Sequence, residues 1–194
     1  MAQERWSAST NTWGVPRGRL VPTLGDEKKN MLFGHKDSFA IEAYYEPSGP
    51  QWAGFGRMCL LVANQCLGDI QEKHCSLFDT VDRFRARLIK TESLWHKSFS
   101  TLSDKDIFAV IDNAIYINGI NELGLNYHPY DFLTNAGEHF NNYKIFLICR
   151  PVGQVTFIYR LPDDTVASAC CDITYFQGTV RSFIDWFDGQ LKIN

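Results

Sequence analysis

The sequence lacks the features that mark membrane, secreted and nucleic-acid-binding proteins. No run approaches the roughly 18 apolar residues of a transmembrane helix. The N-terminus has no continuous apolar segment of the kind that signal peptides contain. The 194 residues include 19 Lys and Arg against 22 Asp and Glu, so no basic excess points to a nucleic-acid partner. We therefore expect a cytoplasmic protein that binds neither membranes nor nucleic acids.

Motifs for nucleotide, thiol and metal chemistry are also missing. No glycine-rich phosphate-binding loop occurs, and no two of the six cysteines have C-x-x-C spacing. None of the five histidines pairs with another at i, i+4, the spacing that places two metal ligands on one helix face. We expect no cofactor, no metal site and no catalytic residues, and hence a protein that acts by binding.

The beginning of the chain differs from the rest. Residues 1–30 have a small basic excess and no hydrophobic period, and Gly and Pro interrupt them repeatedly. Residues 31–194 contain 14 basic and 19 acidic groups. We interpret 1–30 as an irregular leader, either disordered or upstream of a true start at Met31. We expect 31–194 to form a single α+β domain.

Aromatic residues are abundant, with 14 Phe, 8 Tyr and 5 Trp, and such residues favour β-rich cores. Two-residue alternation and turn signals predict six strands, at 38–46, 52–64, 66–70, 143–150, 154–161 and 165–176. Within the first group, a two-residue turn is predicted at Asn64–Gln65, and Gly54 and Gly56 predict a bulge or a close backbone approach.

Helical spacing of apolar residues predicts three helices, at 77–88, 103–116 and 179–191. Ser76 and Ser103 are the predicted N-caps, and Gly189 is the predicted C-cap. Residues 118–143, rich in Asn and Gly, predict a long loop. The order predicts an α+β fold in which two three-stranded antiparallel meanders carry helices packed on one face.

The first patterned segment and the end of the chain resemble immunity protein family 42 of bacterial polymorphic toxin systems. The resemblance covers about 31–90 and 143–190. It rests on these residues: Phe33-Gly34, Phe39-Ala40-Ile41-Glu42, Gly56-Arg57, Asn64, Gly68-Asp69, and Phe183 and Trp186 in the last helix. The resemblance implies a protein that is made beside a secreted toxin, binds it and protects the producing cell. It implies no catalytic residues.

A toxin with a basic cleft would attract acidic groups. On that reading, the candidate contacts are Asp69, Glu72, and the pair Asp163 and Asp164 at a predicted hairpin tip. Tyr44 is the candidate aromatic anchor, because it lies on the wetter face of its predicted strand and Tyr is enriched at interface hot spots.

Two other functions stay open at this point. One is a structural or adaptor module whose leader docks on another protein. The other is a small enzyme that uses Cys170 or Cys171 as a nucleophile, or His128 as a base oriented by Asp131. Cys170 and Cys171 are adjacent in a predicted strand, so their thiols are expected on opposite faces.

Overall fold

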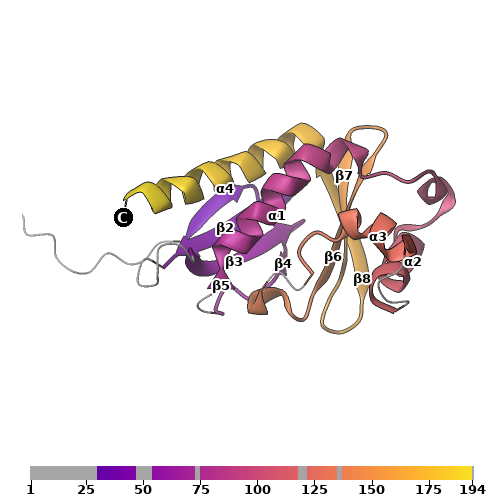
Figure 1. Ribbon diagram of the computed structural model, residues 1–194, viewed down its shortest axis with the longest axis horizontal. Helices are drawn as coiled ribbons and strands as arrows, with labels where there is room; N and C mark the ends of the chain where they lie inside the picture. The colour runs from indigo at the N-terminus through magenta and orange to yellow at the C-terminus, as the bar shows by residue number, and fades with distance from the viewer. Residues whose placement is uncertain (1–29, 47–53, 73–74, 118–121, 135–136, 194) are drawn as a thin grey trace, which may run out of the picture.

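The computed structural model describes residues 30–46, 54–72, 75–117, 122–134 and 137–193 (Figure 1). Within them the chain forms two antiparallel sheets and several helices, which confirms the predicted α+β class. Apart from Asn30, the predicted leader lies outside the described residues.

The first sheet contains the predicted meander and adds strands at its edges. Its path follows the order β1-β2-β3-β4, and β5 also pairs with β3. The two edge strands β1 and β5 were not predicted. The strands are β1 (Met31–Gly34), β2 (Phe39–Tyr45), β3 (Phe55–Val62), β4 (Gln65–Leu67) and β5 (Cys75–Ser76).

The turn between β3 and β4 lies one residue earlier than predicted. Val62 pairs with Gln65, which leaves Ala63 and Asn64 as the two turn residues, with φ of 48° and 65°. Two positive φ values match the twist of a tight hairpin, and Asn tolerates them better than most residues. The close approach predicted at Gly56 is present, because an added Cβ would lie 2.3 Å from the Tyr44 carbonyl oxygen.

The second sheet is the predicted meander, in the order β6-β7-β8. Its strands are β6 (Lys144–Arg150), β7 (Gln154–Arg160) and β8 (Val166–Asp172). The last strand was predicted to continue to residue 176, which is wrong because a helix starts at Ile173. The Asp172 carboxylate accepts hydrogen bonds from the N–H groups of Thr174 (2.7 Å) and Tyr175 (3.1 Å), so it caps that helix and ends the strand.

Within the described ranges, four α-helices complete the fold: α1 (Leu77–Lys90), α2 (Asp104–Asp112), α3 (Glu122–Tyr127) and α4 (Ile173–Ile193). The predicted caps Ser76 and Ser103 accept the expected N–H groups. The predicted C-cap at Gly189 is wrong, because Leu191 packs against the core and the helix continues through the glycine.

The predicted long loop at 118–143 is more ordered than expected. It contains α3 and two short 3-10 helices, His128–Tyr130 and Glu138–Phe140. The helix predicted at 103–116 ends as a π-helical turn, Asn113–Ile117.

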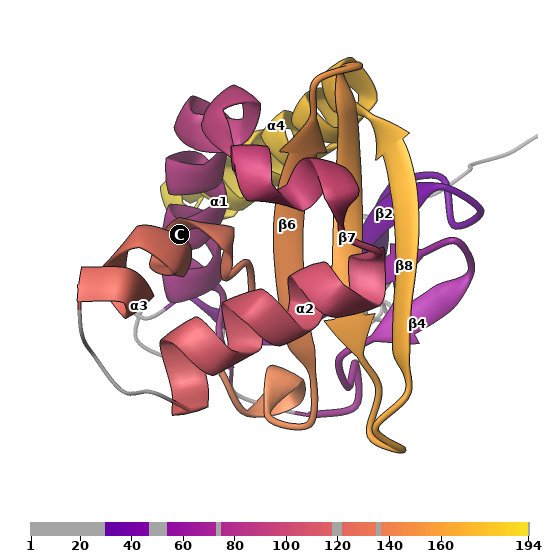
Figure 2. The same cartoon turned by 90° about the vertical axis from the view of Figure 1, so that its right-hand side faces the viewer.

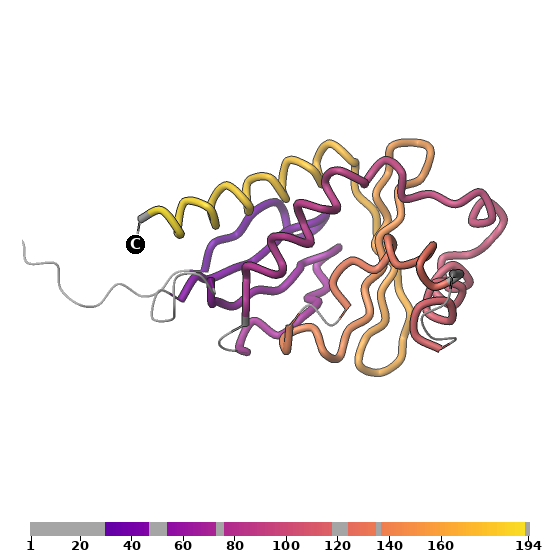
Figure 3. The backbone as a smooth tube through the Cα atoms, viewed as in Figure 1, coloured from indigo at the N-terminus to yellow at the C-terminus, as the bar shows by residue number. Residues whose placement is uncertain are grey.

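Helices α1 and α4 cover one face of the first sheet, as predicted for that sheet (Figure 1). Helix α4 is long enough to contact β1 and β2 as well as β7 and β8, so it spans both sheets; its path is clear in the tube view of Figure 3. Helix α2 contacts β7 and β8 from the other side of the second sheet (Figure 2). The second sheet therefore has helices on both faces.

Six fully buried phenylalanines join these layers at the centre of the core. Phe39 of β2 lies 4.8 Å from Phe157 of β7 and 5.3 Å from Phe176 of α4, measured between ring centroids. Tilted and edge contacts of this kind stabilise beyond the area they bury. We call the set the phenylalanine cluster: Phe39, Phe84, Phe132, Phe157, Phe176 and Phe183.

The Asp172 cap gives a test of why β8 ends and α4 begins. Asp172→Ala removes the acceptor for two N–H groups and should lower the free energy of unfolding by about 1 kcal/mol. Equilibrium denaturation measures the difference. Asp185→Ala, at an exposed position of the same helix, is the matched control and should change stability by less than about 0.5 kcal/mol. Equal losses in the two variants would contradict the capping role.

Candidate functional site

The four acidic candidates lie on two turns, each of which adjoins part of residues 138–144. Asp69 follows β4, and its N–H donates to the carbonyl of His139 at 2.9 Å, which places residues 69–72 beside residues 138–142. Residues 141–144 in turn line a pocket together with 160–164. We call this stretch the acidic edge, formed by Asp69, Glu72, Asp163 and Asp164.

Local turn chemistry explains why these carboxylates lie there. The Asp69 carboxylate accepts the N–H of Gln71 at 2.8 Å, and the Asp163 carboxylate accepts the N–H of Thr165 at 3.0 Å. The second bond lowers the pKa of Asp163, because it favours the charged form. Both residues stabilise tight turns and still expose their charge.

Sequence reasoning missed one acidic residue of this region. Glu138 begins the short 3-10 helix next to Asp69 and is exposed. It lies in the segment predicted as a loop, where no hydrophobic period indicated which side chains would face solvent.

The remaining candidate, Tyr44, lies on a different surface. Phe39, Ile41 and Ala43 of β2 point into the core, so Tyr44 belongs to the outer face of the first sheet. The guanidinium of Arg57 lies 5.9 Å from its ring centroid, and Arg57 also pairs with Glu46 at 2.9 Å. Tyr44 is therefore a partly buried, cation-stacked side chain outside the acidic edge.

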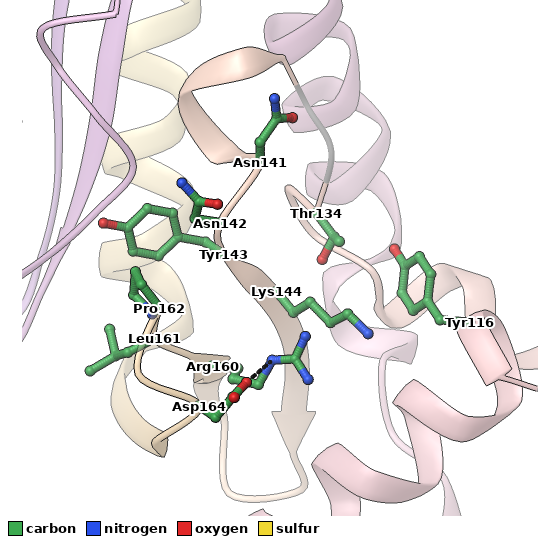
Figure 4. A pocket seen from close by; sticks show the side chains of 10 residues that line it. All are labelled: Tyr116, Thr134, Asn141, Asn142, Tyr143, Lys144, Arg160, Leu161, Pro162 and Asp164. Carbon is green, nitrogen blue, oxygen red and sulfur yellow. Dashed lines mark ion pairs between the residues drawn. The ribbon is translucent and has the colours of Figure 1, made fainter.

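A pocket of about 280 Å³ opens within the acidic edge (Figure 4). Two cations line it: Lys144 at the start of β6 and Arg160 at the end of β7. Lys144 pairs with Asp112 and lies 4.5 Å from the ring centroid of Tyr116. Of the lining residues, the sequence analysis singled out Asp164 alone. The other lining residues are Thr134, Asn141, Asn142, Tyr143, Leu161, Pro162 and Asp164.

A buried hydrogen-bond network supports one wall of the pocket. The carboxylate of Asp131 accepts the Tyr116 hydroxyl at 2.8 Å and the Thr134 N–H at 3.2 Å. The Asp131 carbonyl accepts from the guanidinium of Arg87. Burial, with the nearby Asp131 charge, raises the pKa of Tyr116, so its hydroxyl stays protonated and donating. The network holds Tyr116 in place beside Lys144.

His139 lies behind the acidic edge and is only 2% exposed. Neither ring nitrogen has a hydrogen-bond partner among the described residues, and its ring centroid lies 4.4 Å from that of Phe140. Burial lowers its pKa to about 4, an effect partly opposed by the charge of Asp69. His139 is therefore a neutral packing residue at pH 7.

The residues considered for catalysis are placed as follows. Both oxygens of Asp131 accept hydrogen bonds from Tyr116 and Thr134, so this carboxylate does not orient His128. Cys170 is exposed and Cys171 is buried, which confirms that their thiols lie on opposite faces of β8.

Over the described ranges, no three His, Cys, Asp or Glu side chains gather where they could hold a metal ion. No helix in those ranges is long and apolar enough to span a membrane.

A model of the family described as immunity protein 42 matches residues 31–186. The chain belongs to this family, and its function is that of an immunity protein, the neutralisation of a toxin.

A solved structure shares the fold. The crystal structure of CdiI from Burkholderia dolosa AUO158 superposes with a TM-score of 0.57 at 15% sequence identity, covering 80% of this chain and 99% of that chain. No curated protein matches the chain in sequence.

The buried histidine predicts how stability depends on pH. Since the folded pKa of His139 lies near 4 and the unfolded value near 6.5, the unfolded state binds the proton first as the solution is acidified. This group should remove about 3 kcal/mol of stability between pH 7 and pH 4. His139→Leu should flatten that part of the profile, measured by denaturant unfolding at several pH values.

The control is His128→Gln, which changes an exposed histidine. It should leave the pH profile of the wild type unchanged. A His139→Leu profile as steep as that of the wild type would show that His139 takes up its proton as readily in the folded protein as in the unfolded chain.

Proposed function

We propose that this chain protects its producing cell by forming a one-to-one complex with a single cognate toxin, without catalysis. We place the complex in the cytoplasm and the toxin gene beside the gene for this chain. The observation that supports contact at the acidic edge is that carboxylates from two separate turns adjoin the same segment, residues 138–144: Asp69, Glu72, Asp163 and Asp164. Tyr44 stays a prediction of a separate aromatic contact.

The physical requirements of such a complex fit this surface. A specific interface buries roughly 1,200–2,000 Å² in total, or about 800 Å² on each partner. Exposed carboxylates steer a partner with a basic surface and raise the association rate more than they raise affinity. Turn hydrogen bonds hold Asp69 and Asp163 before binding, so little ordering is needed when the toxin docks.

A growth assay tests the proposal. The neighbouring gene product is expressed in a bacterial host alone, and then together with this chain. Killing by the neighbour and rescue by the chain are the expected results, with a one-to-one complex on co-purification. A harmless neighbour, or killing that this chain does not relieve, would contradict the proposal.

Removing the negative charge of the acidic edge should slow binding. The variant with four neutral substitutions should associate about 10-fold more slowly at low ionic strength, with a weaker salt dependence than the wild type. Stopped-flow or surface-binding kinetics with an inactivated toxin measure the rate. The substitutions are Asp69→Asn, Glu72→Gln, Asp163→Asn and Asp164→Asn.

A second fourfold variant controls for the change in net charge. It neutralises four exposed carboxylates outside the acidic edge and should associate nearly as fast as the wild type. If both variants associate equally slowly, the slower rate comes from the change in net charge, and the toxin does not contact the acidic edge in particular. The control substitutions are Asp37→Asn, Asp79→Asn, Glu92→Gln and Asp185→Asn.

A further inference from the structure

Two positive side chains lie directly opposite each other at the end of the second sheet. In the antiparallel register of β6 and β7, Lys144 is the partner of Arg160. Both line the same pocket, where Figure 4 shows their side chains extending toward one space. Like charges in directly opposed positions repel and destabilise the strand pair. A neutral residue at either position would remove the repulsion between Lys144 and Arg160, yet both positions have a positive charge.

Nearby carboxylates compensate these charges unequally. Lys144 is well held, by Asp112 and by the face of the Tyr116 ring. Arg160 has a weaker partner, because its Nε lies 3.6 Å from the Asp164 carboxylate and the Asp164 side chain is 87% exposed. That distance is beyond a good hydrogen bond, and exposed pairs of this kind contribute little. Among the described residues, no hydrogen bond uses the guanidinium of Arg160.

The pocket therefore contains a cation whose N–H groups are incompletely satisfied. The guanidinium of Arg160 offers several N–H groups in a planar fork, the geometry that binds a carboxylate through two hydrogen bonds. Asn141 and Asn142 also line the pocket, but their amides point away from Lys144 and Arg160 in Figure 4, so the donors that face a ligand come from the two cations. A ligand that suits this set is an anion with two acceptor oxygens.

We propose that this pocket binds the carboxylate of one Asp or Glu side chain that projects from the toxin. The carboxylate would lie between Lys144 and Arg160 and relieve their repulsion. A cavity of about 280 Å³ is just below the ~300–1,000 Å³ typical of small-molecule sites, which favours a single inserted side chain. The inference rests on the proposed function, and it adds a specific contact within the acidic edge.

The arrangement would also fix how the toxin is oriented. The surrounding acidic edge attracts basic groups, whereas Lys144 and Arg160 in the pocket favour an acidic one. A partner must therefore present a carboxylate inside a basic surface. Alternation of charge across an interface selects one register and rejects partners whose charges do not alternate in the same way.

Calorimetric titration of the inactivated toxin into variants of this chain tests the proposal. Arg160→Gln and Lys144→Met should each weaken binding by about 30-fold or more, because each removes one of the two cations that hold the buried toxin carboxylate. The matched controls are Arg181→Gln and Lys105→Met, which remove the same charges from exposed positions on α4 and α2. They should change the affinity by less than about 3-fold.

A double-mutant cycle identifies the toxin residue. Each acidic residue of the toxin is changed to its amide, and binding to wild-type chain and to Arg160→Gln is compared. One toxin variant should lose affinity for the wild-type chain, and Arg160→Gln should then cost less than about 3-fold further. If no toxin carboxylate couples to Arg160, the pocket does not bind one.

The outcomes separate this inference from the proposed function. If the wild-type chain neither binds nor rescues, the proposed function fails. If the wild-type chain binds and rescues while Arg160→Gln and Lys144→Met bind equally well, only the carboxylate site fails. Thermal unfolding of each variant checks folding, and Arg160→Gln decides the question if loss of the Lys144 pair with Asp112 unfolds the protein.

Discussion

Packing of the phenylalanine cluster holds the two sheets and α4 against one another. Phe39, Phe157 and Phe176 come from the first sheet, the second sheet and α4, and their rings touch one another. No other described element contacts both sheets as extensively as α4. Removal of one ring from such a core typically costs about 3–5 kcal/mol, a large share of the stability of a domain this size. Six of the 14 phenylalanines of the sequence lie in this cluster.

The same cluster places the binding surface. Phe157 is held in the core, and three residues further along β7 the strand ends at Arg160. Because Phe157 and Arg160 share one strand, the position of Arg160 follows from core packing and from the pairing of β7 with β6. The other wall depends on the Asp131 network, which holds Tyr116 beside Lys144. The pocket is thus built on rigid elements, whereas the acidic residues around it lie on turns.

Much of the fold follows from local patterns, and the exceptions have physical causes. The second meander and the caps of α1 and α2 were predicted because alternation and capping residues are short-range signals. The start of α4 was missed because Ile173–Phe176 are β-branched or aromatic and favour a strand, until Asp172 caps a helix. Asp163 and Asp164 were recognisable as turn residues, whereas Asp69 was predicted within a strand at 66–70 that in fact ends at Leu67. A tight turn between the two predicted strands implies that Lys144 and Arg160 pair across the sheet. The ion pair of Lys144 with Asp112 could not be predicted, because residues 118–143, which lie between them in the sequence, show no hydrophobic period.

We expect the toxin to cover the acidic edge and its pocket. Hydrogen–deuterium exchange of this chain, alone and in the complex, measures where the toxin binds. Slowed exchange should concentrate in residues 68–72, 138–144 and 160–165, with little change on the outer face of β2. Slowed exchange confined to the outer face of the first sheet, with the edge unchanged, would rule out contact at the edge and place the interface on the surface that contains Tyr44.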